Sequence, residues 1–173
     1  MNLKGCIHIY TGDGKGKTTA AIGLAVRAKG AGMRVLFVQF LKGQHTSELE
    51  PLQNLGIHVM RTESVKKFIP YMNEQEKTVC MQSQQICFEQ ANKLFCDYDV
   101  VIFDEIIGAV TTGMLTLEDV IHMINTKPES LELIFTGRQP PSELVELADY
   151  VSEIKAIKHP YEKGIQARKG IEY

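Results

Sequence analysis

The segment "TGDGKGKTTAA", residues 11–21, follows the apolar run "GCIHIY" and restricts most strongly what this chain can fold into. An apolar strand, a glycine-rich turn with Lys-Thr, and an alanine-rich helix form the context of a phosphate-binding loop. The usual template has four residues between its glycines. Here Gly12 and Gly16 have three residues between them, and Thr11 stands where the first glycine belongs. The segment therefore predicts a phosphate-binding loop whose curvature differs from the usual one.

Short apolar runs alternate with longer helical segments along the chain. The pattern predicts an α/β fold, with a mainly parallel sheet of about six strands and helices on both faces. It favours a single domain over residues 1–173, in which 62–72 and 158–173 match neither a strand nor a helix. The expected strands are 6–10, 34–40, 57–60, 99–105, 131–137 and 150–157, and the expected helices are 18–31, 73–96, one beginning at Thr116, and 140–148. Helix 73–96 is expected to be amphipathic, with an apolar face that consists of Val79, Ile86, Cys87, Ala91, Leu94 and Phe95.

Composition excludes several classes of protein. A net charge of −2 gives no reason to expect nucleic acid as a partner. No apolar run approaches the roughly 20 residues that span a bilayer, and the N-terminus does not resemble a secretory signal. The four cysteines form no Cys-x-x-Cys pair. They are expected to be structural thiols of a cytoplasmic protein, with Cys80 and Cys87 on one buried helix face.

The run "VVIFDE" supplies a second functional element. Its apolar residues bring Asp104 and Glu105 to the carboxyl edge of the sheet, where ligands of open α/β folds bind. These carboxylates and the Thr18 hydroxyl are the predicted ligands of Mg²⁺ or Mn²⁺. An alternative is that the strand-end acid caps the next helix. The predicted ATP-binding residues are Thr11, Gly12, Asp13, Gly14, Lys15, Gly16, Lys17, Thr18 and Thr19, with Arg138 from the end of another strand.

A phosphate loop alone does not identify an activity. A GTPase needs an Asn-Lys-x-Asp guanine reader, and "NTKPE" (125–129) lacks the aspartate. A type II thymidine kinase usually carries zinc-binding cysteines that this chain does not have. A RecA-like motor normally has more chain for coupling hydrolysis to movement.

Five segments together carry a resemblance to a known family. They are "TGDGKGKTTAA", "VQFLKG" (38–43), "VIFDEI" (101–106), "FTGRQPPSELVELAD" (135–149) and "KHPYEKGIQARKGIEY" (158–173). The chain resembles the ATP:corrinoid adenosyltransferases of the CobA/BtuR/CobO type. The resemblance implies a P-loop NTPase (RecA-like) fold and transfer of the 5′-deoxyadenosyl group of ATP to Co(I) of a corrinoid, either cobalamin or cobyrinic acid a,c-diamide. It also implies release of triphosphate, a divalent metal, a homodimer, and a reduced flavoprotein as electron donor.

The same resemblance makes residues 62–72 the corrinoid-side loop and residues 158–173 a tail that faces the substrate. Relatives carry bulky aromatic residues in the corrinoid-side loop, whereas this chain reads "TESVKKFIPYMN" and has no tryptophan. Phe68, Tyr71 and His159 are therefore the candidates for corrinoid contact, and 65–71 is a candidate apolar wedge against the lower cobalt ligand. Packing of Phe68 and Tyr71 in the core is an alternative.

Adenosyl transfer assigns different tasks to the site residues than phosphate cleavage does. The attacked atom is C5′ and the whole triphosphate leaves, so the protein must orient C5′ and stabilise charge on the leaving group. Lys17 and Glu105 are the predicted catalytic residues, with Glu105 acting through the metal. The alternatives are an ATPase in which Glu105 activates water, and a nucleotide-gated binding module without chemistry.

Overall fold

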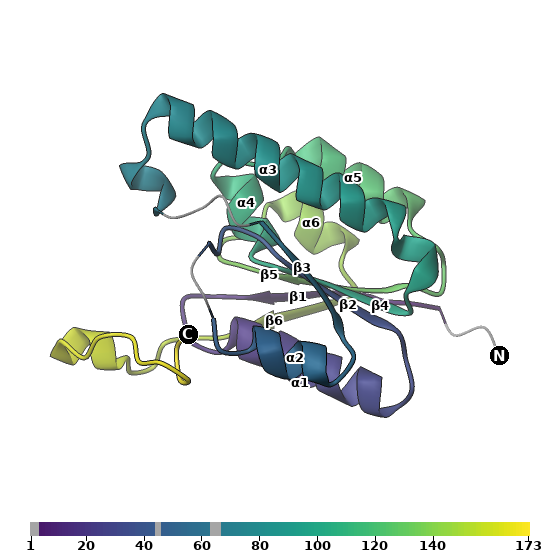
Figure 1. The fold of residues 1–173 in the computed structure, drawn as a ribbon, viewed down its shortest axis with the longest axis horizontal. Helices are drawn as coiled ribbons and strands as arrows, with labels where there is room; N and C mark the ends of the chain where they lie inside the picture. Colours follow the sequence, from purple (N-terminus) through teal and green to yellow (C-terminus); the bar gives the residue numbers. More distant parts are fainter. Residues whose placement is uncertain (1–3, 44–45, 63–66) are drawn as a thin grey trace.

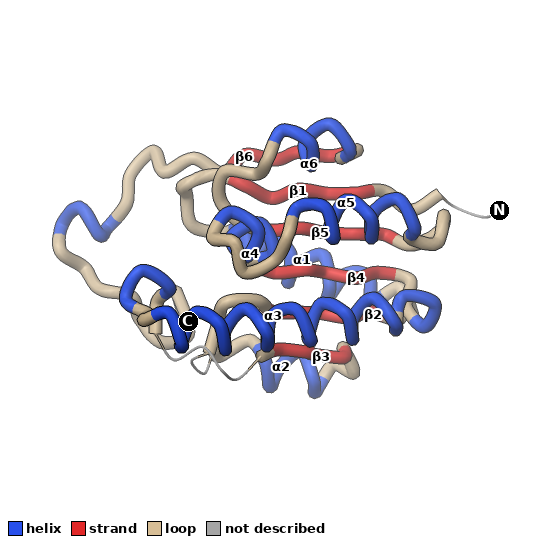
Figure 2. The backbone as a smooth tube through the Cα atoms, turned by 90° about the horizontal axis from the view of Figure 1, so that it is seen from above, coloured by secondary structure: helices blue, strands red, loops and turns tan. Residues whose placement is uncertain are grey.

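The computed structural model describes residues 4–43, 46–62 and 67–173. Within these residues, six strands form one sheet in the order β3-β2-β4-β5-β1-β6, and every neighbouring pair is parallel (Figures 1 and 2). The predicted α/β fold, with a parallel sheet of six strands, is confirmed. The strands are β1 (Ile7–Thr11), β2 (Val35–Gln39), β3 (His58–Arg61), β4 (Val100–Asp104), β5 (Glu132–Thr136) and β6 (Tyr150–Glu153).

Helices cover both faces of the sheet. Figure 1 shows α1 (Lys17–Gly30) and α2 (Leu49–Asn54) on one face, and α3 (Glu74–Lys93), α4 (Ile106–Thr111), α5 (Leu117–Thr126) and α6 (Ser142–Leu147) on the other. Each face encloses its own hydrophobic cluster. Short 3-10 turns lie at Ile69–Tyr71, Phe95–Asp97 and Pro160–Lys163. Within the described part of the chain, no helix is both long and apolar enough to cross a membrane.

Burial on both faces explains the composition of the two strands beside the site. Every residue of β2 and β4 is buried, so both strands are apolar almost throughout. Their polar residues, Gln39 and Asp104, are the last of each strand and lie opposite each other in the parallel register. Phe103, one residue before Asp104, lies against the rings of four phenylalanines: Phe40, Phe88, Phe95 and Phe135. The carboxyl end of β4 is therefore held by the core itself.

The buried face of the long helix α3 differs in part from the one that the sequence predicts. Its N-terminus has a capping box, in which Asn73 Oδ1 accepts from the Glu76 N–H and the Glu76 carboxylate accepts from the Asn73 N–H. Val79 and Ile86, which were expected on the core face, are both 55% exposed. The buried face instead consists of Cys80, Gln84, Cys87, Phe88 and Ala91.

The predicted burial of Cys80 and Cys87 is confirmed. Burial raises the pKa of the Cys87 thiol to about 11, so this thiol stays protonated near neutral pH. All four cysteines of the chain are free thiols in the structure, as expected from their spacing.

The last strand is shorter than the sequence predicts. It ends at Glu153 instead of residue 157, and its four residues are exposed because β6 is an edge strand. The chain after it leaves the body of the molecule and then returns (Figure 1). Its last residue lies near α2, where the Ser47 hydroxyl donates to the Tyr173 carbonyl oxygen at 3.0 Å. Residues 160–173 are exposed throughout.

Candidate nucleotide and metal site

The first half of the phosphate loop packs against the segment that follows β6. The Gly14 N–H donates to the Ile154 carbonyl oxygen at 2.8 Å, and Asp13 Oδ1 accepts from the Ala156 N–H at 3.2 Å. Gly12 has a φ of 104°, and a Cβ there would lie 2.3 Å from the Ile154 oxygen. A side chain at position 12 would therefore meet both a strained backbone and another chain segment.

The second half of the loop is open. Gly16 has a φ of 125°, and a Cβ there would have no atom within 4 Å. Helix α1 begins at the next residue, Lys17. An anion that binds beside this part of the loop would therefore face the N-terminal N–H groups of α1 and the positive end of its dipole. The geometry suits a phosphate group that approaches from the Gly16 side.

Lys17 is buried and lies across the loop. Its ammonium donates to the carbonyl oxygens of Gly12 at 2.7 Å and Gly14 at 2.9 Å. Burial lowers the pKa of Lys17, and the charge of Arg138 lowers it further. The ammonium is thus held by neutral carbonyl groups, and phosphate oxygens are stronger partners that can replace them.

Asp104 is fully buried and is the centre of a polar cluster at the carboxyl edge of the sheet. Its oxygens accept from the Thr18 hydroxyl at 2.8 Å, the Thr136 hydroxyl at 2.7 Å and the Lys42 ammonium at 2.7 Å. A longer contact of 3.4 Å comes from Gln39 Nε2. Helix α1, strands β2 and β5, and the loop after β2 therefore fix this carboxylate in place.

The oxygens of Thr18 and Asp104 fit a small hard cation. Mg²⁺ is usually held by one or two carboxylates together with phosphate oxygens and water. Among the described residues, no group of three or more His, Cys, Asp or Glu side chains could hold a metal. A cation at Thr18 and Asp104 would therefore need oxygens from the nucleotide to complete its coordination.

Glu105 has a left-handed backbone conformation, with a φ of 62°. Such a conformation in a residue other than glycine costs free energy and often marks a functional position. The residue precedes α4, but its side chain makes no capping hydrogen bond, so the alternative that it caps this helix is wrong. Burial raises the pKa of the Glu105 carboxyl, and the neighbouring Asp104 charge adds to this effect. The Glu105 N–H donates to the Thr136 hydroxyl at 2.9 Å, and this hydroxyl donates to Asp104. The backbone of Glu105 therefore belongs to the hydrogen-bond network of the buried carboxylate.

Sequence reasoning missed three members of this cluster: Gln39, Lys42 and Thr136. The available signal was a glutamine at the end of an otherwise apolar strand, followed after two residues by a lysine, in "VQFLKG". Since β2 lies beside β4, residues after β2 reach the same edge of the sheet as Asp104. Strand order, which the sequence does not state, is what makes Lys42 part of the site.

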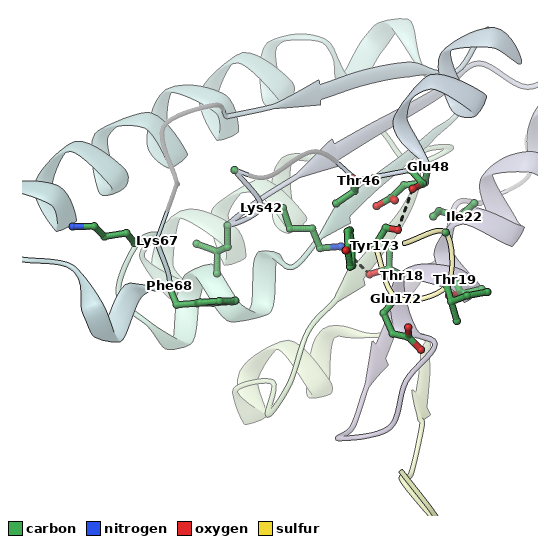
Figure 3. Close-up of a pocket in the computed structure, with 15 residues that line it drawn as sticks. Thr18, Thr19, Ile22, Lys42, Thr46, Glu48, Lys67, Phe68, Glu172 and Tyr173 are labelled. Carbon is green, nitrogen blue, oxygen red and sulfur yellow. Dashed lines mark hydrogen bonds between the residues drawn. The ribbon is translucent and has the colours of Figure 1, made fainter. Parts of the chain in front are cut away.

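A cavity of about 500 Å³ opens beside this cluster. Figure 3 shows Thr18, Thr19, Lys42, Phe68 and Tyr173 around it, drawn from segments far apart in the sequence. Its wall thus combines the beginning of α1, the loop after β2, the segment before α3, and the C-terminal residues. It is large enough for part of a substrate to lie against the phosphate loop.

The predicted corrinoid residues do not all reach this cavity. Phe68 lines it and is 76% exposed, whereas Tyr71 is 78% exposed and is not part of the wall. Core packing of these two residues, the alternative reading, is therefore wrong. His159 is half-buried away from the cavity, and its Nδ1 accepts from the Tyr161 N–H at 3.2 Å. Residues 65 and 66 of the candidate wedge lie outside the described residues.

Arg138 is an exposed residue just after β5. Its charge influences the pKa of Lys17, Asp13 and Glu105, which places it near the phosphate loop and the acidic strand end. A glycine loop between β1 and α1, a buried lysine, and a threonine bonded to a strand-end aspartate define a nucleotide-binding protein of the P-loop class.

The particular family follows from comparison of the whole chain. The profile of the family "ATP:corrinoid adenosyltransferase BtuR/CobO/CobP" matches residues 3–173, and the chain belongs to this family. The corrinoid adenosyltransferase of Escherichia coli K12 is 35% identical, over 98% of this chain and 86% of its own. The corrinoid adenosyltransferase CobA of Salmonella typhimurium LT2 has the same identity and coverage.

A third relative, the corrinoid adenosyltransferase of Pseudomonas aeruginosa, is 31% identical over 98% of this chain and 84% of its own. Among solved structures, the KaiC-like protein PH0186 of Pyrococcus horikoshii OT3 aligns with 88% of this chain and 73% of its own. The identity is 14% and the TM-score is 0.48.

Proposed function

We propose that this protein transfers the 5′-deoxyadenosyl group of ATP to the Co(I) centre of a corrinoid and releases triphosphate. Membership of the adenosyltransferase family over the whole chain is the observation that carries this proposal. The cluster around Lys17, Thr18 and Asp104 supports it, because it offers cationic and metal-binding groups to a polyphosphate. Cobalamin and cobyrinic acid a,c-diamide are the two candidate acceptors.

In this reaction the protein need not activate the nucleophile, because Co(I) is itself strongly nucleophilic. Its task is to orient C5′ toward cobalt and to stabilise the charge that develops on the leaving triphosphate. Lys17 and the N–H groups of residues 13–18 serve the phosphate oxygens, with Arg138 close to them. Thr18 and Asp104, with Glu105 beside them, are the proposed ligands of Mg²⁺ or Mn²⁺, which when bound neutralises part of the triphosphate charge.

The proposed roles require that C5′ faces the cavity and that the γ-phosphate lies deep in the loop. The bond that breaks is then C5′–O, and no water is aligned with the γ-phosphorus. Glu105 consequently has no hydrolytic role, and its raised pKa does not have to serve a general base.

Product analysis tests the proposed function against its alternatives. The protein is incubated with ATP and Mg²⁺, with and without a corrinoid pre-reduced to Co(I). Adenosyl transfer gives triphosphate and an adenosylated corrinoid in equal amounts, and only when the corrinoid is present. An ATPase gives ADP and phosphate in both mixtures, and a binding module gives no product. Either of the latter results would overturn the proposal.

Phe68 is the proposed contact to the corrinoid, since it is exposed and lines the cavity beside the nucleotide site. Phe68→Ala is expected to slow adenosylation from Co(II) much more than adenosylation from pre-reduced Co(I), because an apolar wedge assists removal of the lower cobalt ligand. Thermal stability should change little, since the side chain is 76% exposed. Ile86→Ala, which also removes an exposed apolar side chain from the same face of the sheet, is the control.

A loss of about 3–5 kcal/mol in unfolding free energy, the size expected for a core phenylalanine, would contradict the exposed position of Phe68 on which this role rests. Equal slowing of both reactions would remove its proposed role in the reduction step. Tyr71 and His159 remain weaker candidates, because neither lines the cavity.

We also propose a homodimer, a reduced flavoprotein as electron donor, and a cytoplasmic location. The substrate-facing tail, residues 158–173, supports an assembly because Tyr161, Ile165 and Ile171 are apolar and exposed on it. A measured molecular mass of about 19.4 kDa in solution would contradict the dimer. The free thiols fit a reducing compartment.

A further inference from the structure

The Lys42 ammonium lies between the two groups proposed to bind the metal. Its Nζ is 2.7 Å from Asp104 Oδ2 and 3.2 Å from Thr18 Oγ1, and Thr18 Oγ1 is 2.8 Å from Asp104 Oδ1. Figure 3 shows the lysine extended across the cavity toward Thr18. A positive charge therefore already contacts the oxygens that a divalent cation would use.

The backbone around Lys42 is fixed in a way that directs the side chain to this position. Leu41 has a left-handed conformation with a φ of 57°, which is costly for a residue other than glycine. The Leu41 N–H donates to Oε1 of the buried Gln84 at 3.1 Å, and the Lys42 carbonyl oxygen accepts from Arg61 at 2.8 Å. Helix α3 and strand β3 thus stabilise a turn that brings the lysine back over the end of β4.

The ammonium and a metal ion cannot occupy this place together. Mg²⁺ binds oxygens at about 2.0–2.1 Å, and Nζ is 3.2 Å from Thr18 Oγ1, so a metal on Thr18 and Asp104 would lie within about 5 Å of Nζ. Two cations at that separation repel each other strongly in a partly buried site. The lysine has a flexible four-carbon stem, and its side chain is 27% exposed, so the ammonium has room to move toward the cavity.

We propose that Lys42 occupies the metal position in the nucleotide-free protein, so that a divalent cation binds tightly only together with the triphosphate. This inference rests on the proposed function, because it takes Thr18 and Asp104 as the metal ligands. Entry of the metal displaces the ammonium from Asp104, and the displaced charge then pairs with triphosphate oxygens in the cavity. Lys42 is in this sense a positioning residue that couples metal binding to nucleotide binding.

The test compares Mn²⁺ binding to the protein with and without ATP, measured by electron paramagnetic resonance of free Mn²⁺ after subtraction of the Mn²⁺ that ATP binds without protein. The wild-type protein should bind Mn²⁺ alone weakly and Mn²⁺ with ATP much more tightly. Lys42→Met should bind Mn²⁺ alone at least about tenfold more tightly than wild type, while its affinity for Mn²⁺ with ATP falls. Lys42→Arg, which keeps the charge, should bind Mn²⁺ alone as weakly as wild type.

Two further variants show where the metal binds. Asp104→Asn combined with Lys42→Met should lose the gain in Mn²⁺ affinity, because the gain depends on the freed carboxylate. Lys77→Met, which breaks the surface ion pair with Glu74 on α3, should leave Mn²⁺ binding unchanged. Lys42→Gln removes the charge but keeps a hydrogen-bond donor for Asp104. This variant replaces Lys42→Met in the Mn²⁺ measurement if Lys42→Met does not unfold cooperatively.

The proposal is wrong if neither uncharged variant binds Mn²⁺ alone more tightly than wild type. It is also wrong if the wild-type protein binds Mn²⁺ equally well with and without ATP, a result that needs no variant. Neither measurement uses a corrinoid. A protein that forms triphosphate and adenosylated corrinoid but shows no effect of Lys42 on Mn²⁺ binding would refute this inference and leave the proposed function intact.

Discussion

Asp104→Asn is expected to reduce adenosyl transfer by about 100-fold or more. The substitution keeps the shape of the side chain but removes the charge that binds Thr18, Lys42 and the proposed metal. A hydrogen bond to a charged group contributes about 1.5–3 kcal/mol, and about 1.4 kcal/mol corresponds to a tenfold change in rate. Loss of two such contacts costs about 3 kcal/mol or more, which corresponds to the expected reduction in rate of about 100-fold or more. The measurement is the rate of adenosylcorrinoid formation from pre-reduced corrinoid at saturating Mg²⁺.

Asp99→Asn is the matched control for this variant. Asp99 immediately precedes β4, at the opposite end of the strand from Asp104, and its carboxylate pairs with Arg34 on the surface. Transfer should remain close to the wild-type rate in this variant, since the pair is exposed and far from the phosphate loop. Full activity of Asp104→Asn would exclude Asp104 as a metal ligand, whatever the control shows.

Lys17→Ala should weaken ATP binding or turnover by about tenfold or more. The substitution removes a charge-assisted contact to the triphosphate worth roughly 1.5–3 kcal/mol. The loss of activity in Lys17→Ala has a different cause from the loss in Asp104→Asn, because the lysine acts on the phosphate directly and not through the metal. Raising the Mg²⁺ concentration should therefore not restore the activity of Lys17→Ala. ATP affinity measured by calorimetry, together with the rate of triphosphate release, checks the expectation.

Lys29→Ala provides the comparison, since Lys29 lies in the last turn of the same helix. Circular dichroism should show that both variants keep their helices. If Lys17→Ala bound ATP and released triphosphate as wild type does, the assignment of Lys17 to the leaving group would have to be abandoned.

Much of the fold follows from local sequence patterns. Apolar strands buried on both faces give long runs such as "VVIFD", and alternation with helices predicts a parallel sheet. The errors have physical causes. Strand β6 ends early because it lies at the sheet edge, where no second neighbour extends its hydrogen bonds. Val79 and Ile86 have helical spacing but face solvent, because Cys80 and Phe88 supply the buried face.

The site is less predictable than the fold, because strand order determines it. Lys17, Thr18, Asp104 and Glu105 stand in recognisable motifs, and the sequence identifies each without knowledge of the sheet. Lys42 has no motif of its own, and only the pairing of β2 with β4 brings it to Asp104. The sequence gives least information about segments 62–72 and 158–173, where it predicts neither strand nor helix. Tyr71 and His159 were predicted from these segments, and neither of them lines the cavity.

The packing of the phosphate loop against Ile154 and Ala156 makes the two ends of the sequence interdependent. The loop is usually regarded as a self-contained motif, whose shape depends on its glycines and the helix that follows. Here one wall of it is built from residues more than a hundred positions later. A fragment that stops after β5 would keep every loop residue and still lose the surface that shapes the loop. The loop of this protein is therefore not transferable to another scaffold as a short peptide.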